Sequence, residues 1–166
     1  MPKTGAIVLV GPMGVGKTTI GKKLAKRLAL PFIDTDSVIA DRFGPIPEIF
    51  AQHGETVFRE YEEQCVIDSI SEPAVVATGG GAVLSEHSRA AFTQTVVVYL
   101  TTDGKHMASR LSGGNRPLLK DGINDWRRIF ESRRSLYEQV ADLTIDTSRV
   151  ALKSIVEEIV SELNKR

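Results

Sequence analysis

The sequence is poor in cysteine, since Cys65 is the only one among its 166 residues. No disulfide can form within the chain, and this is typical of proteins of the reducing cytosol. We expect Cys65 to be a small buried residue on a helix rather than a reactive thiol.

A net charge and a long apolar run are also missing. Lys and Arg together number 21, as do Asp and Glu, so the formal net charge is zero. Proteins that bind nucleic acids or membrane surfaces are usually basic, so this balance disfavours both kinds of partner. No apolar stretch approaches the roughly 20 residues that span a bilayer, and residues 1–5 do not resemble a secretory signal. We expect a soluble, cytoplasmic protein.

Short apolar runs alternate with amphipathic segments, and hydrophobic residues, at 42% of the sequence, suffice for a core. The expected strands are residues 6–10, 31–33, 74–78, 95–100 and 143–145. The expected helices are residues 18–28, 37–43, 48–51, 56–70, 85–92, 105–111, 125–140 and 152–163. This alternation predicts an α/β fold with helices on both faces of a parallel sheet. No repeat or linker divides it, so we expect one domain over residues 1–166.

The segment Gly11–Thr18 reads GPMGVGKT and matches the phosphate-binding pattern G-x-x-x-x-G-K-[ST] in full. It follows an expected strand and opens an expected helix, which is the context that such a loop requires. Glycines let backbone N–H groups surround a phosphate, and the helix adds its positive end. Lys17 can reach the outer phosphates, and the Thr18 hydroxyl can ligate Mg²⁺. We predict that a nucleoside triphosphate is bound by Gly11, Gly14, Val15, Gly16, Lys17, Thr18 and Thr19.

This motif alone does not separate kinases from GTPases, ATPases or nucleotide-dependent switches. A guanine-binding N-K-x-D motif is absent from the sequence, which disfavours a GTPase. The acceptor of the phosphate, if there is one, must be inferred from other residues.

The segment Asp34–Asp36 follows the second expected strand. The first three strands end at Gly11, Asp34 and Gly79, and ligands of parallel sheets bind where such ends converge. We expect its two carboxylates to serve different partners. One can then hold Mg²⁺ through water while the other accepts a proton from an acceptor hydroxyl. An equally good alternative is that an aspartate caps the helix that follows.

Four arginines and three glycines are candidates for the acceptor site and its closure. Arg59 can pair with Glu62, three residues later on the same helix, and the pair can fix the guanidinium in position to bind an anion of the acceptor. The alternative is an ordinary solvent-exposed ion pair without a function. Gly79–Gly81 favours a close approach of backbone to a ligand. Arg116 lies in a glycine-containing loop that can close over phosphates, unless this loop is a plain polar turn. Arg133 and Arg134 form either a solvated face or a carboxylate site.

With these motifs identified, the chain closely resembles the shikimate kinase family. The resemblance runs nearly end to end, and the ordered set of matches is specific. The matching segments are Gly11–Thr18, 32–36, 49–50, 54–55, 58–59, Gly79–Gly81, 116–119, Arg134 with Tyr137, and 145–147. Two segments depart from the family pattern, because residues 44–49 are one residue short and carry two prolines and residues 110–116 are also short.

The resemblance implies a three-layer fold like that of nucleoside monophosphate kinases, with five parallel strands in the order 2-3-1-4-5. It implies transfer of phosphate from ATP to the 3-hydroxyl of shikimate with Mg²⁺, a step toward chorismate and the aromatic amino acids. It also implies an acceptor-binding lobe at about residues 35–63 and a lid at about 112–124. We expect a monomer.

The family's site residues map onto matching positions. The implied catalytic residues are Lys17, Asp36 and Arg116, with Asp36 as base and Arg116 brought by the lid. The implied shikimate-binding residues are Asp36, Arg59, Gly79, Gly80, Gly81 and Arg134, with Glu62 orienting Arg59. Thr18, and Asp34 through water, would hold Mg²⁺, and Arg110 would stack on adenine.

Two other functions stay open at this point. A gluconate or nucleoside monophosphate kinase would share the fold, although a monophosphate acceptor calls for more cations. A nucleotide-dependent switch without transfer would share the phosphate loop.

Overall fold

The computed structural model describes residues 4–111, 118–148 and 150–166. Its sheet has five parallel strands in the order β2-β3-β1-β4-β5, as the resemblance implied. The strands are β1 Ile7–Val10, β2 Phe32–Asp34, β3 Val75–Ala77, β4 Val96–Thr101 and β5 Leu143–Asp146. The first strand is central, with Leu9 opposite Ala77 on one side and opposite Val98 on the other.

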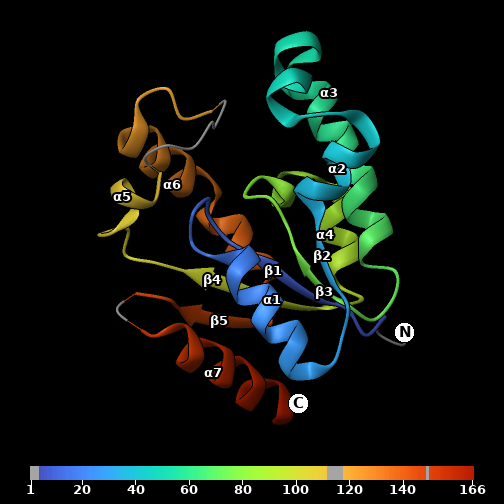
Figure 1. The fold of residues 1–166 in the computed structure, drawn as a ribbon, viewed down its shortest axis with the longest axis vertical. Helices are drawn as coiled ribbons and strands as arrows, with labels where there is room; N and C mark the ends of the chain where they lie inside the picture. The colour runs from blue at the N-terminus through green and yellow to red at the C-terminus, as the bar shows by residue number, and fades with distance from the viewer. Residues whose placement is uncertain (1–3, 112–117, 149) are drawn as a thin grey trace.

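Helices join the strands and cover both faces of the sheet (Figure 1). They are α1 Lys17–Leu28, α2 Thr35–Phe43, α3 Ile46–Ser69, α4 Glu86–Phe92, α5 Met107–Leu111, α6 Gly122–Val140 and α7 Leu152–Asn164, with a short 3₁₀ turn η1 at Ala82–Leu84. None of the helices in the described part of the chain is long and apolar enough to cross a membrane.

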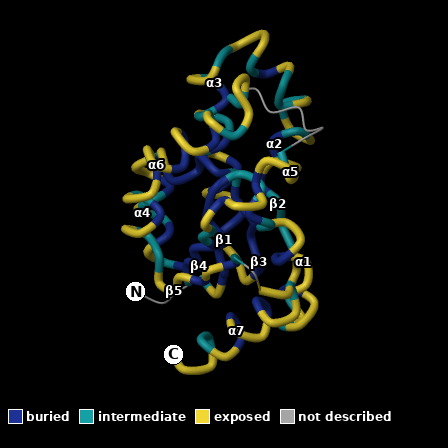
Figure 2. Tube along the Cα trace, turned by 90° about the vertical axis from the view of Figure 1, so that its left-hand side faces the viewer, coloured by how far each residue is buried: buried dark blue, intermediate teal, exposed yellow. Residues whose placement is uncertain are grey.

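The central strand explains the three layers, because all four of its residues are buried. Val8 and Val10 face the apolar cluster that includes α3, α4 and α6, whereas Ile7 and Leu9 face the cluster that includes α1 and α7. A strand with both faces covered must be apolar throughout, which is the pattern that the sequence showed. Figure 2 shows this buried centre beneath the more exposed outer turns of the helices.

A third apolar cluster lies in α2 and α3, which rise above the sheet at the top of Figure 1. Its buried members are Ile39, Ile49, Phe58 and Cys65. The rings of Phe43 and Tyr61 stack beside them, with 3.8 Å between centroids. Cys65 is therefore a buried helical residue, as predicted.

The predicted helices at 48–51 and 56–70 are one element, α3, with a kink between them. The kink is at Gly54, whose φ of 82° and ψ of 176° are not helical. The prolines of the preceding loop do not prevent the helix, because Pro45 is its N-cap and Pro47 lies in its first turn, where proline is tolerated.

Candidate active site

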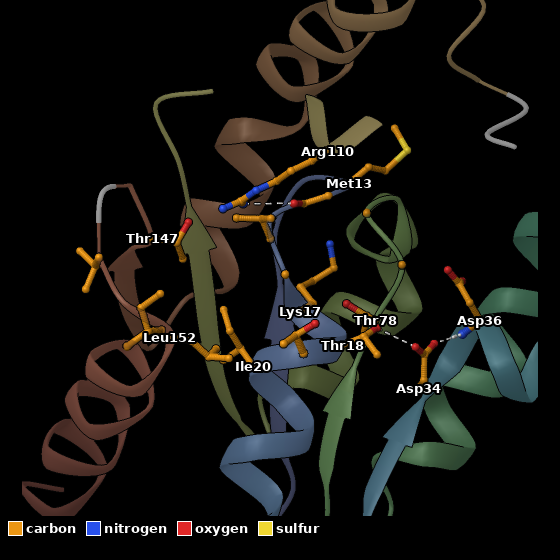
Figure 3. A pocket seen from close by; sticks show the side chains of 18 residues that line it. Met13, Lys17, Thr18, Ile20, Asp34, Asp36, Thr78, Arg110, Thr147 and Leu152 are labelled. Atoms are coloured by element: carbon orange, nitrogen blue, oxygen red, sulfur yellow. Dashed lines mark hydrogen bonds between the residues drawn. The ribbon is translucent and has the colours of Figure 1, made fainter. Parts of the chain in front are cut away.

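The phosphate-binding loop connects β1 to α1 at the carboxyl end of the central strand (Figure 3). A side chain at Gly11 would collide with the carbonyl oxygen of Leu100 in β4. The backbone passes β4 so closely here that only glycine fits at position 11. Gly16 is the N-cap of α1 and contributes no side-chain hydrogen bond to the helix end. The first turn of α1 thus presents its backbone N–H groups to the loop, an arrangement that attracts anions.

Lys17 lies inside this loop. Its Nζ donates to the carbonyl oxygens of Gly11, at 2.7 Å, and Pro12, at 2.8 Å. The ammonium is therefore held over the loop in which a phosphate would sit. Lys17 lines a pocket, here called the nucleotide pocket, at this end of the sheet. Other residues predicted to bind the nucleotide also line it, namely Gly14, Val15, Gly16, Thr18 and Thr19.

Thr18 and Asp34 bring two oxygen atoms together beside the loop. The Thr18 hydroxyl donates to Oδ2 of Asp34 at 2.8 Å (Figure 3). Oδ1 of the same carboxylate accepts from the backbone N–H groups of Asp36, at 2.9 Å, and Ser37, at 3.4 Å. A hydroxyl and a carboxylate are the hard oxygen donors that Mg²⁺ prefers, so these two residues fit the ion.

The segment Asp34–Asp36 is extended only at Asp34, because α2 begins at Thr35. Asp34 ends β2 and caps α2, as the capping alternative predicted, and its role toward Mg²⁺ stays a prediction. Asp36 lies in the first turn of α2, and it lines the nucleotide pocket as well as the neighbouring pocket.

The far end of the nucleotide pocket is formed by α5 and α7. Arg110 lines it, and its Nη1 donates to the carbonyl oxygen of Gly14 at 3.4 Å. Thr147, Val150, Leu152 and Ile155 complete this end. Arg110 is thus close to the phosphate loop, and its expected contact with adenine stays a prediction.

A second pocket adjoins the first and combines charged with apolar walls. Its polar side is formed by Asp36, Arg59, Glu62, Arg133 and the backbone of Gly79–Gly81. Its apolar side is formed by Ile46, Phe50, Phe58 and Leu118. Met13, Asp36, Gly79 and Gly80 line both pockets, so ligands in the two would meet at these residues.

Arg59 is fixed by carboxylates on its own helix. Its Nη1 donates to Oε1 of Glu62 at 2.8 Å, and its Nε donates to Oε2 of Glu55 at 3.2 Å. The pairing of Arg59 with Glu62 was predicted from their spacing. A side chain at Gly81 would overlap the Arg59 guanidinium, which explains the need for glycine at this point of the loop.

Glu62 is a buried carboxyl, with 3% of its surface exposed. Burial raises its pKa above the usual value, and the nearby Arg59 opposes this shift. Asp36 raises the pKa further, whereas Arg133 lowers it. Two acids and two arginines therefore influence one another across this pocket.

Arg133, rather than Arg134, lines the second pocket, which corrects the expected position of the second arginine. Arg133 is buried, with 6% of its surface exposed. The side chain of Arg134 is 46% exposed, donates to Glu131 at 2.6 Å and lies over the ring of Phe130. The cause is the helical period, because consecutive residues of α6 point about 100° apart.

Tyr137 joins α6 to the glycine loop after β3. Its hydroxyl donates to the carbonyl oxygen of Gly80 at 2.5 Å, and burial raises its pKa to about 12. It therefore stays protonated and able to donate. Tyr137 was not among the predicted site residues. Its spacing of four residues from Arg133 is the signal that would have placed both on one helical face.

Arg116 lies outside the described residues, as do residues 112–117 of the expected lid. Leu118 is described and touches the second pocket. In the described part of the chain, no three His, Cys, Asp or Glu side chains gather into a group that could hold a metal.

A family model, curated relatives and solved structures all point to the same protein family. The family model described as shikimate kinase matches residues 13–164. The shikimate kinase of Thioalkalivibrio sulfidiphilus is 43% identical over 166 residues, covering 96% of this chain and 87% of that protein. The shikimate kinase of Enterococcus faecalis is 36% identical over 168 residues, covering 96% and 99%. The solved shikimate kinase of Acinetobacter baumannii in complex with shikimate superposes with a TM-score of 0.92 at 36% identity, covering 97% and 93%.

Proposed function

Because the chain belongs to the shikimate kinase family, we propose that it transfers the γ-phosphate of ATP to the 3-hydroxyl of shikimate. The product, shikimate 3-phosphate, leads toward chorismate and the aromatic amino acids. The observation that carries the proposal is the joining of two pockets, one built for phosphates and one with two arginines, at four shared residues.

Shikimate offers a carboxylate and several hydroxyls, and the second pocket has matching groups. Arg59 and Arg133 are both available for the carboxylate, and the planar guanidinium suits such an anion. Asp36 can accept hydrogen bonds from the hydroxyls, and Gly79–Gly81 leave room for the ring. Arg133 takes the role that the resemblance had assigned to Arg134.

Transfer requires the acceptor oxygen and the γ-phosphorus to be held in line. The oxygen forms a bond to phosphorus while the bond to the bridging oxygen breaks, and ADP leaves. Asp36 lines both pockets and takes the hydroxyl proton. Lys17, Asp36 and Arg116 are the proposed catalytic residues, with Lys17 and Arg116 stabilising charge on the transferred group.

Thr18, and Asp34 through water, would hold Mg²⁺, which supplies neutralisation of phosphate charge when bound. Arg110 would stack on adenine at the other end of the nucleotide pocket. Gly11, Gly14, Val15, Gly16 and Thr19 would complete the site for ATP. Residues 112–124 would form a lid that carries Arg116 and excludes water.

We further propose a single domain over residues 1–166, with residues 35–63 as the acceptor-binding lobe. Its separate apolar cluster supports this division. We propose that the protein works as a monomer in the cytoplasm, with no nucleic-acid or membrane partner. The balanced charge and the single cysteine support this placement.

An assay of ADP release over a panel of acceptors tests the proposed function. The panel contains shikimate, gluconate and nucleoside monophosphates, with ATP and Mg²⁺ in excess. We expect turnover with shikimate well above the rate without acceptor. Turnover with gluconate or a nucleoside monophosphate but not with shikimate would contradict the proposal. ADP release that no acceptor stimulates would also contradict it.

A further inference from the structure

One buried face of α6 reaches both pockets. Trp126, Phe130, Arg133 and Tyr137 are buried and follow one another at intervals of four, three and four residues. Arg133 lines the acceptor pocket, and Tyr137 bonds to Gly80. At the other end of this face, Nε1 of Trp126 donates to the carbonyl oxygen of Met13 in the phosphate loop at 2.7 Å.

The indole is held firmly on several sides. Trp126 has only 1% of its surface exposed, and its ring lies 5.2 Å from that of Phe130. A side chain at Gly104, after β4, would come within 3.0 Å of the indole. A rigid donor of this kind fixes the position of its acceptor, because leaving a buried N–H without a partner is costly.

The hydrogen bond determines how one peptide of the loop is oriented. The carbonyl of Met13 and the N–H of Gly14 belong to the same trans peptide and point in opposite directions. With the carbonyl bound to Trp126, the N–H points away from α6. Gly14 lines the nucleotide pocket, in which an N–H is a donor to phosphate.

We propose that Trp126 is a positioning residue for the phosphate loop: its indole N–H holds the Met13–Gly14 peptide in the orientation that binds the nucleotide. The proposal rests on the nucleotide site of the proposed function. It does not depend on which acceptor receives the phosphate.

Two replacements at this position separate the hydrogen bond from the bulk of the ring. Trp126→Phe keeps an aromatic ring without the N–H. Since Trp126 is the only tryptophan, growth with 3-benzothienylalanine replaces this side chain alone with a bicyclic isostere that has no N–H. If Trp126→Phe does not fold, the protein with the isostere still tests the role of the hydrogen bond.

The main measurement is the dissociation constant of MgADP by calorimetry, which requires no turnover. We expect either replacement to weaken MgADP about threefold to tenfold, the value of one typical hydrogen bond, and to weaken shikimate alone less than about twofold. The KM for ATP should rise in the same proportion. Ile129→Val is the matched control at another buried position of α6, and it should lower Tm while leaving MgADP affinity unchanged.

Unchanged MgADP affinity in the isostere would overturn the proposal, and so would an equal loss of shikimate affinity, which would indicate a general packing defect. Failure of the proposed function has a different signature. In that case the parent would bind MgADP but would not release ADP with shikimate. The MgADP affinities of the parent and the Trp126 variants would still decide whether the indole N–H positions the phosphate loop.

Discussion

The side chains of Arg133 and Arg134 face different environments although the residues are neighbours on α6. Arg133 is buried against the acceptor pocket, and Arg134 is half-exposed and paired with Glu131. We expect Arg133→Ala to raise the KM for shikimate about tenfold to hundredfold, because a hydrogen bond to a charged group contributes about 1.5–3 kcal/mol. Steady-state kinetics with either substrate varied will measure this effect.

Arg134→Ala is the matched control for this prediction. It should leave the KM for shikimate and for ATP within about twofold of the parent, since exposed ion pairs contribute little. A larger loss in Arg134→Ala than in Arg133→Ala would contradict our assignment. Equal losses of ATP and shikimate affinity in Arg133→Ala would contradict the carboxylate role.

We expect Glu62 to make the acceptor site dependent on pH. Burial raises its pKa, so the folded protein holds this proton more strongly than the unfolded chain does. The resulting contribution to stability is present at low pH and is lost as the pH rises through the folded pKa. When Glu62 is ionised it pairs with Arg59, and when it is protonated this pairing weakens.

We therefore expect the KM for shikimate to rise as the pH falls through the raised pKa of Glu62. Glu62→Gln should have a high KM that no longer changes over this range, and this variant distinguishes Glu62 from any other titrating group. Profiles of kcat/KM for shikimate between pH 5 and 8, in parent and variant, test this. If Glu62→Gln keeps the pH dependence of the parent, another titratable group causes that dependence.

At the scale of the elements, the loop from β3 to η1 passes so close to α3 that Gly81 leaves no room for a Cβ beside Arg59. The φ of Gly81 is −98°, which any residue adopts, so Gly81→Ala should act on Arg59 and not on the backbone. We expect a KM for shikimate raised about tenfold or more, since 1.4 kcal/mol of lost binding has that effect, and an unchanged KM for ATP.

A double-mutant cycle checks whether the Gly81 effect passes through Arg59. In an Arg59→Ala background, adding Gly81→Ala should cost little more, because the group that it displaces has been removed. Additive losses in the double variant would mean that the methyl group blocks shikimate directly.

The sequence predicted the elements well because each has a local signal. The apolar runs of the strands, the periodic helices and the motif at Gly11–Thr18 all depend on residues close together in the chain. The Arg133 assignment was also within reach, because the positions of Trp126, Phe130 and Tyr137 define one face that contains Arg133 and excludes Arg134. The resemblance pointed to Arg134, whereas the helical period favours Arg133.

Other features of the site could not be predicted, because they depend on contacts between distant segments. The bond from Trp126 to Met13 joins residues 113 positions apart, and that from Tyr137 to Gly80 joins residues 57 apart. The start of α2 at Thr35 is a borderline case. Asp34 was a possible cap, but its simultaneous bond to Thr18 requires β2 and α1 to be in place.

At the scale of the whole molecule, the described residues contain no metal-binding group of three or more His, Cys, Asp or Glu side chains. In the proposed site only Thr18 and Asp34 serve Mg²⁺, so we expect the nucleotide to supply much of its coordination. We expect EDTA to abolish turnover and to leave the Tm of the nucleotide-free protein unchanged. MgADP should raise Tm by mass action, and EDTA should remove much of that increase.

Calorimetric melting curves with and without EDTA, in the presence and absence of ADP, test this prediction. A fall in Tm on adding EDTA to the free protein would reveal a structural metal that the proposed site does not include. Turnover that persists in excess EDTA would contradict the Mg²⁺ requirement.

The central place of β1 has a consequence for how the protein is made. Of the five strands β1 is made first, but its two neighbours are β3 and β4, which begin at Val75 and Val96. At about 5–20 residues per second, roughly 3–13 s pass before β3 follows. During that time both edges of Ile7–Val10 are unpaired, so we expect the nascent chain to be most prone to misassociation before its partner strands are made.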